Sequence, residues 1–147
     1  MKELVYEEID IGMPIPPLSK TVNLLSLAQY SAATWDLHYA HLDRDFAKSK
    51  GFPGIFMDGQ EFGALFACMI TRWAGPPVVF KKMGMSYRTF AVSGDMVTCT
   101  GKVRDKYEKD GEYFVDCELS VQNQRNEKIV GPAYALITVR SRRDRDK

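Results

Sequence analysis

The sequence predicts a single α+β domain in which an antiparallel sheet wraps around one long buried helix. Two observations support this fold class. Residues 59–73 are apolar on almost every side of a helix, as in helices buried within a protein. After Pro77 the apolar residues recur at every second position, which is typical of strands with one buried face. The chain of 147 residues has the length of one ordinary domain, so we expect one domain spanning residues 1–147.

The charge balance limits the classes of partner. The chain has 20 basic and 19 acidic residues and a net charge of +1, which argues against a nucleic-acid binder. No apolar stretch approaches the roughly 20 residues that a membrane-spanning helix needs. The first ten residues, MKELVYEEID, lack the apolar core of a signal peptide. We therefore expect a cytoplasmic protein that binds neither nucleic acid nor membrane.

The first half of the chain predicts one extended segment and two helices. Three prolines, at positions 14, 16 and 17, favour an extended lead-in. The apolar spacing over Val22–Ala33 predicts an amphipathic helix that ends near Thr34. A short helix is predicted over Asp43–Lys50, since Gly51 and Pro53 follow it.

The long buried helix has a clear beginning and end. Asp58 is suited to be its N-cap, and Glu61 stands three residues later, as in a capping box. The helix then runs from Gly59 to about Trp73, before Gly75-Pro76-Pro77.

Four long antiparallel strands are expected after this helix. Turn signals stand at residues 93–95, 109–112 and 123–128. A single sheet leaves one flank of the helix open, so we expect a homodimer or higher homo-oligomer in which two copies cover each other's helices.

The two histidines of the chain, His38 and His41, lie between Asp36 and Asp43. Three interpretations are open. The segment is a solvated loop whose aspartates cap helices, or it holds a metal ion, or it supplies an acid–base pair. Because no further histidine or cysteine lies nearby to complete a metal site, we expect no metal.

The pattern around these residues resembles the MaoC-like dehydratase family, the (R)-specific enoyl-CoA hydratases with a hotdog fold. Asp36 and His41 have the family's Asp-x4-His spacing, Gly51-Phe52 follows, and Gly59 stands where the family places its oxyanion-hole glycine. Residues 85–88 and 93–97 resemble the strand, turn and strand that follow. Three positions depart from the usual motif: His38 replaces an Asn, Tyr39 a Pro, and Asp58 a His.

The resemblance implies a hydro-lyase that hydrates 2-enoyl-CoA thioesters or dehydrates 3-hydroxyacyl-CoA thioesters. His41 would act as the base, Asp36 would hold the water and handle the second proton, and the backbone N–H of Gly59 would hold the thioester oxygen. His38 would orient water or substrate, or only form supporting hydrogen bonds. No cofactor is expected, because coenzyme A is part of the substrate.

Three further residues are candidates for substrate binding. Tyr30 and Trp35 would line an acyl pocket, with a place in the aromatic core as the alternative. Arg88 would meet the phosphates of coenzyme A, with a solvated strand face as the alternative.

Two other functions remain open. Hotdog folds also host thioesterases, in which Asp58 or Glu61 would be the acting carboxylate. The departures at His38 and Asp58 also suit a non-catalytic acyl-CoA-binding subunit of a heteromeric dehydratase, in a hetero-oligomer with a related hotdog subunit.

Overall fold

The computed structural model describes residues 3–144 and contains one five-stranded antiparallel sheet with the strand order β1-β3-β4-β5-β2. Short 3-10 turns at Tyr6–Glu8, Tyr39–His41 and Arg142–Asp144 complete the structure. The helices and strands are α1 (Leu24–Thr34), α2 (Arg44–Ser49), α3 (Gly59–Ala74), β1 (Pro14–Thr21), β2 (Val79–Tyr87), β3 (Met96–Lys109), β4 (Glu112–Asn123) and β5 (Lys128–Val139).

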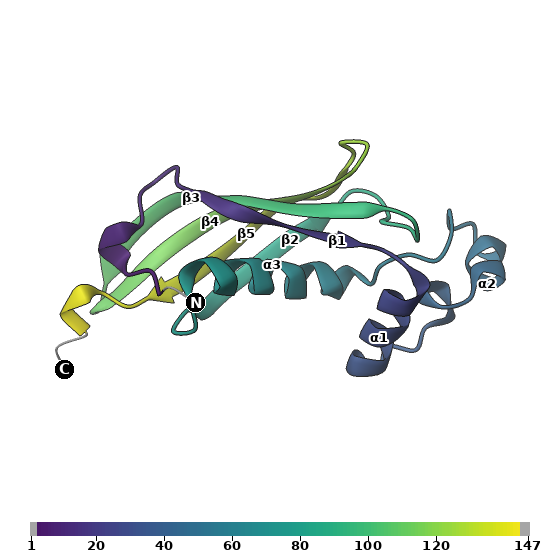
Figure 1. Ribbon diagram of the computed structural model, residues 1–147, viewed down its shortest axis with the longest axis horizontal. Coiled ribbons are helices and arrows are strands. Elements are labelled where there is room, and N and C mark those ends of the chain that lie inside the picture. The colour runs from purple at the N-terminus through teal and green to yellow at the C-terminus, as the bar shows by residue number, and fades with distance from the viewer. Residues whose placement is uncertain (1–2, 145–147) are drawn as a thin grey trace.

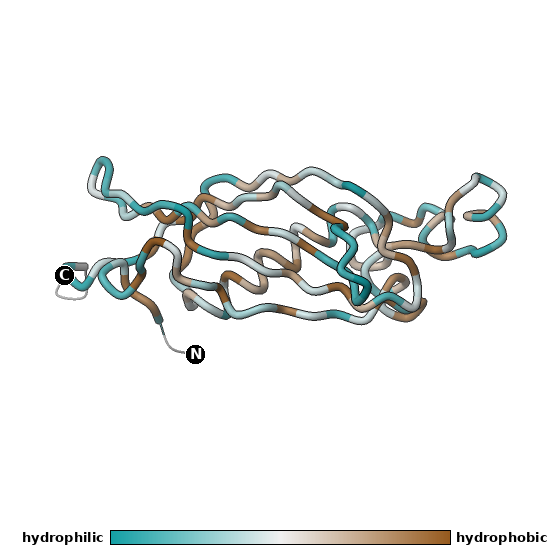
Figure 2. Tube along the Cα trace, turned by 90° about the horizontal axis from the view of Figure 1, so that it is seen from above, coloured by the Kyte–Doolittle hydropathy of each residue, from teal (hydrophilic) through white to brown (hydrophobic). Residues whose placement is uncertain are grey.

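Helix α3 lies along the inner face of the sheet, while α1 and α2 form a lobe beyond one end of it (Figure 1). Apolar segments run along both α3 and the strands (Figure 2). Phe66 and Ile70 of α3 are fully buried in the same core as Cys99, Cys117 and Ile137 of the sheet. The predicted fold class is confirmed, and so is the predicted order of the elements.

The turns between strands follow the local signals. Asp110 and Gly111 both have positive φ angles, 53° and 77°, as a two-residue hairpin between twisted strands requires. In the next turn, the Asn123 side chain accepts hydrogen bonds from the N–H groups of Arg125 and Glu127. Both hairpins lie at the predicted positions.

Helix α3 has one buried side and one open flank. Phe62, Phe66 and Met69 are buried, whereas Ala64 is exposed and Cys68 is only half-buried. Since the helix is apolar on both sides, its open flank is suited to contact with another protein surface. No helix within residues 3–144 is long and apolar enough to cross a membrane.

The start of α3 differs from the predicted capping box. The Asp58 side chain accepts a hydrogen bond from the N–H of Gln60, as an N-cap does. Glu61, however, is 2% exposed and pairs with Lys20 of β1 instead of reaching back. The capping box was wrong because Glu61 faces the sheet, where burial of its carboxylate demands a cationic partner.

Candidate active site

Three polar side chains meet where the α1–α2 lobe joins α3. Asp36 follows α1, His41 ends the 3-10 turn Tyr39–His41, and Asp58 is the N-cap of α3. One donor atom of each lies within 4.8 Å of the other two. Both carboxylates are half-buried, and His41 is 9% exposed. The fold therefore brings together the predicted pair, Asp36 and His41, and adds a second carboxylate.

The protonation of the His41 ring is set by its surroundings. Its Nδ1 lies 2.7 Å from the carbonyl oxygen of Phe56. A carbonyl oxygen only accepts hydrogen bonds, so Nδ1 carries the proton and donates it. Neutral His41 then has its free lone pair on Nε2, where it can accept a proton from water.

In the neutral ring of His38 the proton is on the other nitrogen. Its Nδ1 accepts a hydrogen bond of 3.2 Å from the N–H of Ala40, so the proton of the neutral ring is on Nε2. The exposed His38 ring stands edge-on to that of His41, with centroids 6.0 Å apart. The backbone N–H of His38 also donates to Asp36 Oδ1 at 3.3 Å. His38 thus supports Asp36 and the turn that presents His41.

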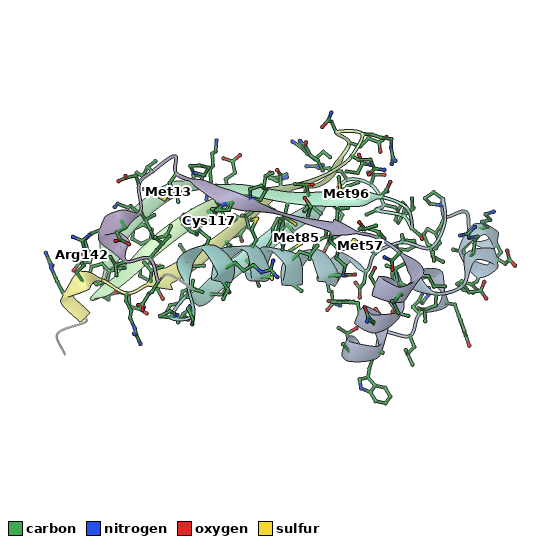
Figure 3. The ribbon with its side chains drawn as sticks, viewed as in Figure 1. Met13, Met57, Met85, Met96, Cys117 and Arg142 are labelled. Carbon is green, nitrogen blue, oxygen red and sulfur yellow. The ribbon has the colours of Figure 1, made fainter. Side chains whose placement is uncertain are left out.

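The loop that holds His41 is joined to a second loop. Phe56 forms an antiparallel bridge with Val92. On either side of this bridge, Met57 N–H donates to Ala91 O and Ser93 N–H donates to Ile55 O, both at 2.9 Å. Figure 3 labels Met57, which lies just before α3 at the junction with the lobe. The Phe56 carbonyl therefore has a fixed position opposite His41.

Asp95 anchors the second loop. It is 2% exposed and accepts hydrogen bonds from Val92 N–H, Gln124 and Arg125. Burial opposes its charge, but these hydrogen bonds outweigh the effect of burial and hold the pKa of Asp95 below its ordinary value. The loop is thus tied to the β4–β5 turn by a buried carboxylate.

A cavity of about 310 Å³ opens at the start of α3. Gly59 and Phe62 of α3 line it, together with Tyr87 at the end of β2 and Phe90 of the following loop. The N–H of Gly59 donates to no other group within residues 3–144. An unpaired N–H at a helix N-terminus is an oriented donor for developing negative charge.

Tyr87 covers Gly59. Its hydroxyl donates to the Gly59 carbonyl oxygen at 2.9 Å. A Cβ atom at Gly59 would lie 3.0 Å from the Tyr87 ring, so a larger residue here would press on that ring, whereas glycine allows the close approach. Burial, followed by the charge of Asp58, raises the pKa of Tyr87. The hydroxyl is therefore protonated at neutral pH, as its hydrogen bond to the Gly59 carbonyl oxygen requires.

The three predicted substrate-binding residues differ in burial and in their contacts. Tyr30 is half-buried, and burial together with the charges of Asp58, Glu61 and Asp36 raises its pKa, which places it beside the carboxylates. Arg88 lines the cavity and donates through Nε to Gly131 O at 2.5 Å. Trp35 is 85% exposed, so the alternative of a place in the core is wrong for it. It adopts a left-handed conformation as the C-cap of α1, which turns it away from the core.

Sequence reasoning missed three features of the site. They are the Phe56 carbonyl, the Tyr87 hydroxyl and the approach of Asp58 to the Asp36–His41 pair. A strand was expected in this part of the chain, but no sequence signal indicated that Tyr87, the last residue of β2, would contact Gly59 of α3.

The cluster also defines where a metal ion would bind. Asp36, His41 and Asp58 are the one set of donor atoms between residues 3 and 144 that is compact enough to hold one. Two oxygens and one nitrogen suit a divalent cation, while the same groups equally suit acid–base chemistry. The expectation of a metal-free site stays a prediction.

The sequence model for the MaoC like domain matches residues 9–124, which include Asp36, His41 and Asp58 together with Gly59 and Tyr87. The chain belongs to this family. This membership, together with the sheet wrapped around α3, confirms the hotdog fold of the MaoC-like proteins.

The chain is also similar to individual known proteins in sequence or in structure. The chain is 29% identical over 93 residues to the 3-oxo-4,17-pregnadiene-20-carboxyl-CoA hydratase beta subunit of Mycobacterium tuberculosis, covering 63% of this chain and 72% of that protein. The R-hydratase PhaJ1 of Pseudomonas aeruginosa superposes with a TM-score of 0.85 at 21% identity, covering 95% of this chain and 87% of the other. The ChsH1–ChsH2 complex of M. tuberculosis gives 0.79 at 25% identity, with coverages of 89% and 98%.

Proposed function

We propose that this MaoC-like chain is a hydro-lyase that reversibly hydrates 2-enoyl-CoA thioesters to 3-hydroxyacyl-CoA thioesters. The observation that carries the proposal is the arrangement at the start of α3. Asp36 and His41 lie together beside Asp58, and Asp58 directly precedes the unpaired N–H of Gly59 at the cavity. A proton carrier and an oxyanion donor are the groups that this reaction requires.

Each group has a defined part in the addition of water. His41 Nε2 removes a proton from a water molecule held by Asp36, and the water oxygen bonds to the β carbon of the substrate. The negative charge moves to the thioester oxygen, where Gly59 N–H donates to it. The α carbon then takes a proton from the Asp36–His41 pair, and the double bond is saturated. Dehydration follows the same steps in reverse.

Asp58 is the feature that opposes full activity. Its carboxylate lies beside the position where the thioester oxygen would become negative, although its hydrogen bond from Gln60 N–H offsets part of its charge. This favours a second candidate function, a non-catalytic acyl-CoA-binding subunit of a heteromeric dehydratase. Two of the relatives described above are a beta subunit and a member of a two-component complex.

A thioesterase receives less support from the site. Of its two candidate carboxylates, Glu61 is buried and paired with Lys20. Asp58 is occupied as the helix cap. Glu61 is thus neutralised by its partner, and Asp58 has one carboxylate oxygen engaged in the cap.

We further propose that the open flank of α3 is covered in an oligomer. The partner is a second copy of this chain or a related hotdog subunit. The exposed Ala64 and half-buried Cys68 on this flank support the proposal. A chain that elutes strictly as a monomer in light-scattering measurements would contradict it.

The test is a spectroscopic screen of the purified chain against a panel of enoyl-CoA thioesters of different length and branching. Hydration removes the absorbance of the conjugated thioester without releasing a thiol. Asp36→Asn should abolish turnover and leave thermal unfolding nearly unchanged. Release of free coenzyme A would favour a thioesterase. Substrate binding with turnover only after addition of a related subunit would favour the non-catalytic role.

A further inference from the structure

A second hollow, of about 290 Å³, lies next to the cavity at Gly59. The two share a wall that is formed by the bridged loops. Phe56 and Ala91 line the first hollow, whereas their chain neighbours Ile55 and Val92 line the second. The two hollows therefore lie on opposite sides of the hydrogen-bonded bridge between Phe56 and Val92.

The second hollow has a cationic side. Arg44 and Lys48 of α2 both line it and, being four residues apart, project from the same side of the helix. Both are exposed, and neither forms an ion pair with any residue of the described part of the chain. These two cations are therefore available to an anion.

The acidic groups nearby do not cancel this charge. Asp43 is the N-cap of α2 and accepts hydrogen bonds from Asp45 N–H and Phe46 N–H. Asp95, on the opposite loop, is buried and paired with Arg125. Asp45 is exposed on α2 and does not line the hollow.

Neutral donors complete the lining. Ser93 contributes a hydroxyl that has no hydrogen-bond partner among residues 3–144. Gly54 faces open space, since a Cβ atom there would meet nothing within 4 Å. Two free cations with an adjacent hydroxyl and an open backbone form a set of groups that binds phosphate oxygens.

From these observations we propose that the hollow between α2 and the loop at Ser93 binds the phosphate end of coenzyme A. The acyl thioester then lies in the cavity at Gly59, and the pantetheine arm passes over the outer edge of the bridged loops from one hollow to the other. The assignment rests on the proposed acyl-CoA function and adds the position of the nucleotide. It makes Arg44 and Lys48 affinity-determining residues that take no part in the chemistry.

The test measures binding of coenzyme A itself to the full chain by calorimetry. The variant Arg44→Gln/Lys48→Gln should weaken binding at least about tenfold, as expected for the loss of charge-assisted phosphate contacts. The matched control, Lys109→Gln/Arg143→Gln, removes two positive charges at the opposite end of the molecule (Figure 1) and should change affinity less than about twofold. Equal affinities in the two variants, or no binding of coenzyme A by the wild type, would overturn the proposal.

A kinetic arm separates this proposal from the proposed reaction. With an enoyl-CoA substrate the Arg44→Gln/Lys48→Gln variant should show a raised KM and an unchanged kcat. With the matching enoyl-pantetheine thioester, which lacks the phosphates, its KM should equal that of the wild type. A chain without turnover on either substrate would refute the hydratase, while the calorimetry would still decide on the phosphate site.

Discussion

The Nδ1 atom of His41 lies 2.7 Å from the carbonyl oxygen of Phe56, and this contact fixes which ring nitrogen can act as a base. Phe56 is itself bridged to Val92, whose loop is anchored by the buried Asp95. The reactive nitrogen is therefore oriented by a chain of backbone contacts rather than by a carboxylate partner on Nδ1.

Replacing His41 should have a far larger effect than replacing His38. We expect His41→Ala to lower kcat/KM by about 10²- to 10⁴-fold, the usual range for loss of a general base. His38→Asn should keep most of the activity, because the amide oxygen of Asn can still accept the hydrogen bond from Ala40 N–H. Steady-state kinetics with an enoyl-CoA measure both. Comparable losses in the two variants would show that His38 shares the chemistry.

Removing the charge of Asp58 should accelerate the reaction. Asp58→Asn keeps an N-cap that can accept from Gln60 N–H, while it removes the negative charge next to Gly59. We expect kcat to rise about fivefold, equivalent to about 1 kcal/mol in the barrier. Asp43→Asn, which alters the cap of α2 in the same way, is the matched control and should leave kcat unchanged. A fall in kcat for Asp58→Asn would make Asp58 part of the catalytic machinery.

The contact between Tyr87 and Gly59 predicts steric sensitivity at Gly59. Gly59→Ala would place a methyl group 3.0 Å from the Tyr87 ring, displacing the ring or the start of α3. Alanine keeps the backbone N–H, but a shifted helix start would misplace it, so we expect kcat/KM to fall by up to about 10²-fold, the size of effect found when an oxyanion donor is removed. Gly63→Ala is the control one turn along α3, since its Cβ would meet only the flexible side chains of Met85, at 3.4 Å (Figure 3), and Met83, at 3.8 Å. Activity losses of equal size at both glycines would count against a special role for Gly59.

Asp95 should make stability depend on pH in the acidic range. Because the folded protein holds the pKa of Asp95 below its ordinary value of 3.8, the ionised carboxylate stabilises the fold above that pH, and the contribution is lost as the pH falls through the lowered pKa. Asp95→Asn should cost about 1–2 kcal/mol at neutral pH, from weakened charge-assisted hydrogen bonds. Urea unfolding should show this difference shrinking below pH 3.8. A difference that is the same at all pH values would show that the charge of Asp95 is unimportant.

Local patterns predicted the elements of the fold because their causes are local. The alternation of apolar residues after Pro77 and the Asp110-Gly111 turn are properties of neighbouring residues, and the strands lie where they indicated. The capping box failed for a non-local reason. Glu61 pairs with Lys20, which is distant in sequence and approaches only when β1 packs against α3.

The same distinction holds for the candidate site. The residues alone left the segment around Asp36 and His41 open to three interpretations, and the resemblance to the MaoC-like family singled out Asp36, His41 and Gly59 as site residues. For Trp35, in contrast, the residue type was a poor guide to its position. An aromatic side chain favours burial in general, but the left-handed C-cap of α1 turns Trp35 into solvent.

The sequence by itself determined the type of domain, the order of its helices and strands, the positions of the turns between strands, and the short segment that carries Asp36 and His41. These features follow from periodicity, turn residues and motif spacing, which act over a few neighbouring residues. Only the tertiary structure decided that Phe56 orients His41, that Tyr87 covers Gly59, and that Arg44 and Lys48 face a hollow beside the cavity. Each of these depends on packing between segments that are far apart in the chain, and no local pattern specifies which distant segments will meet.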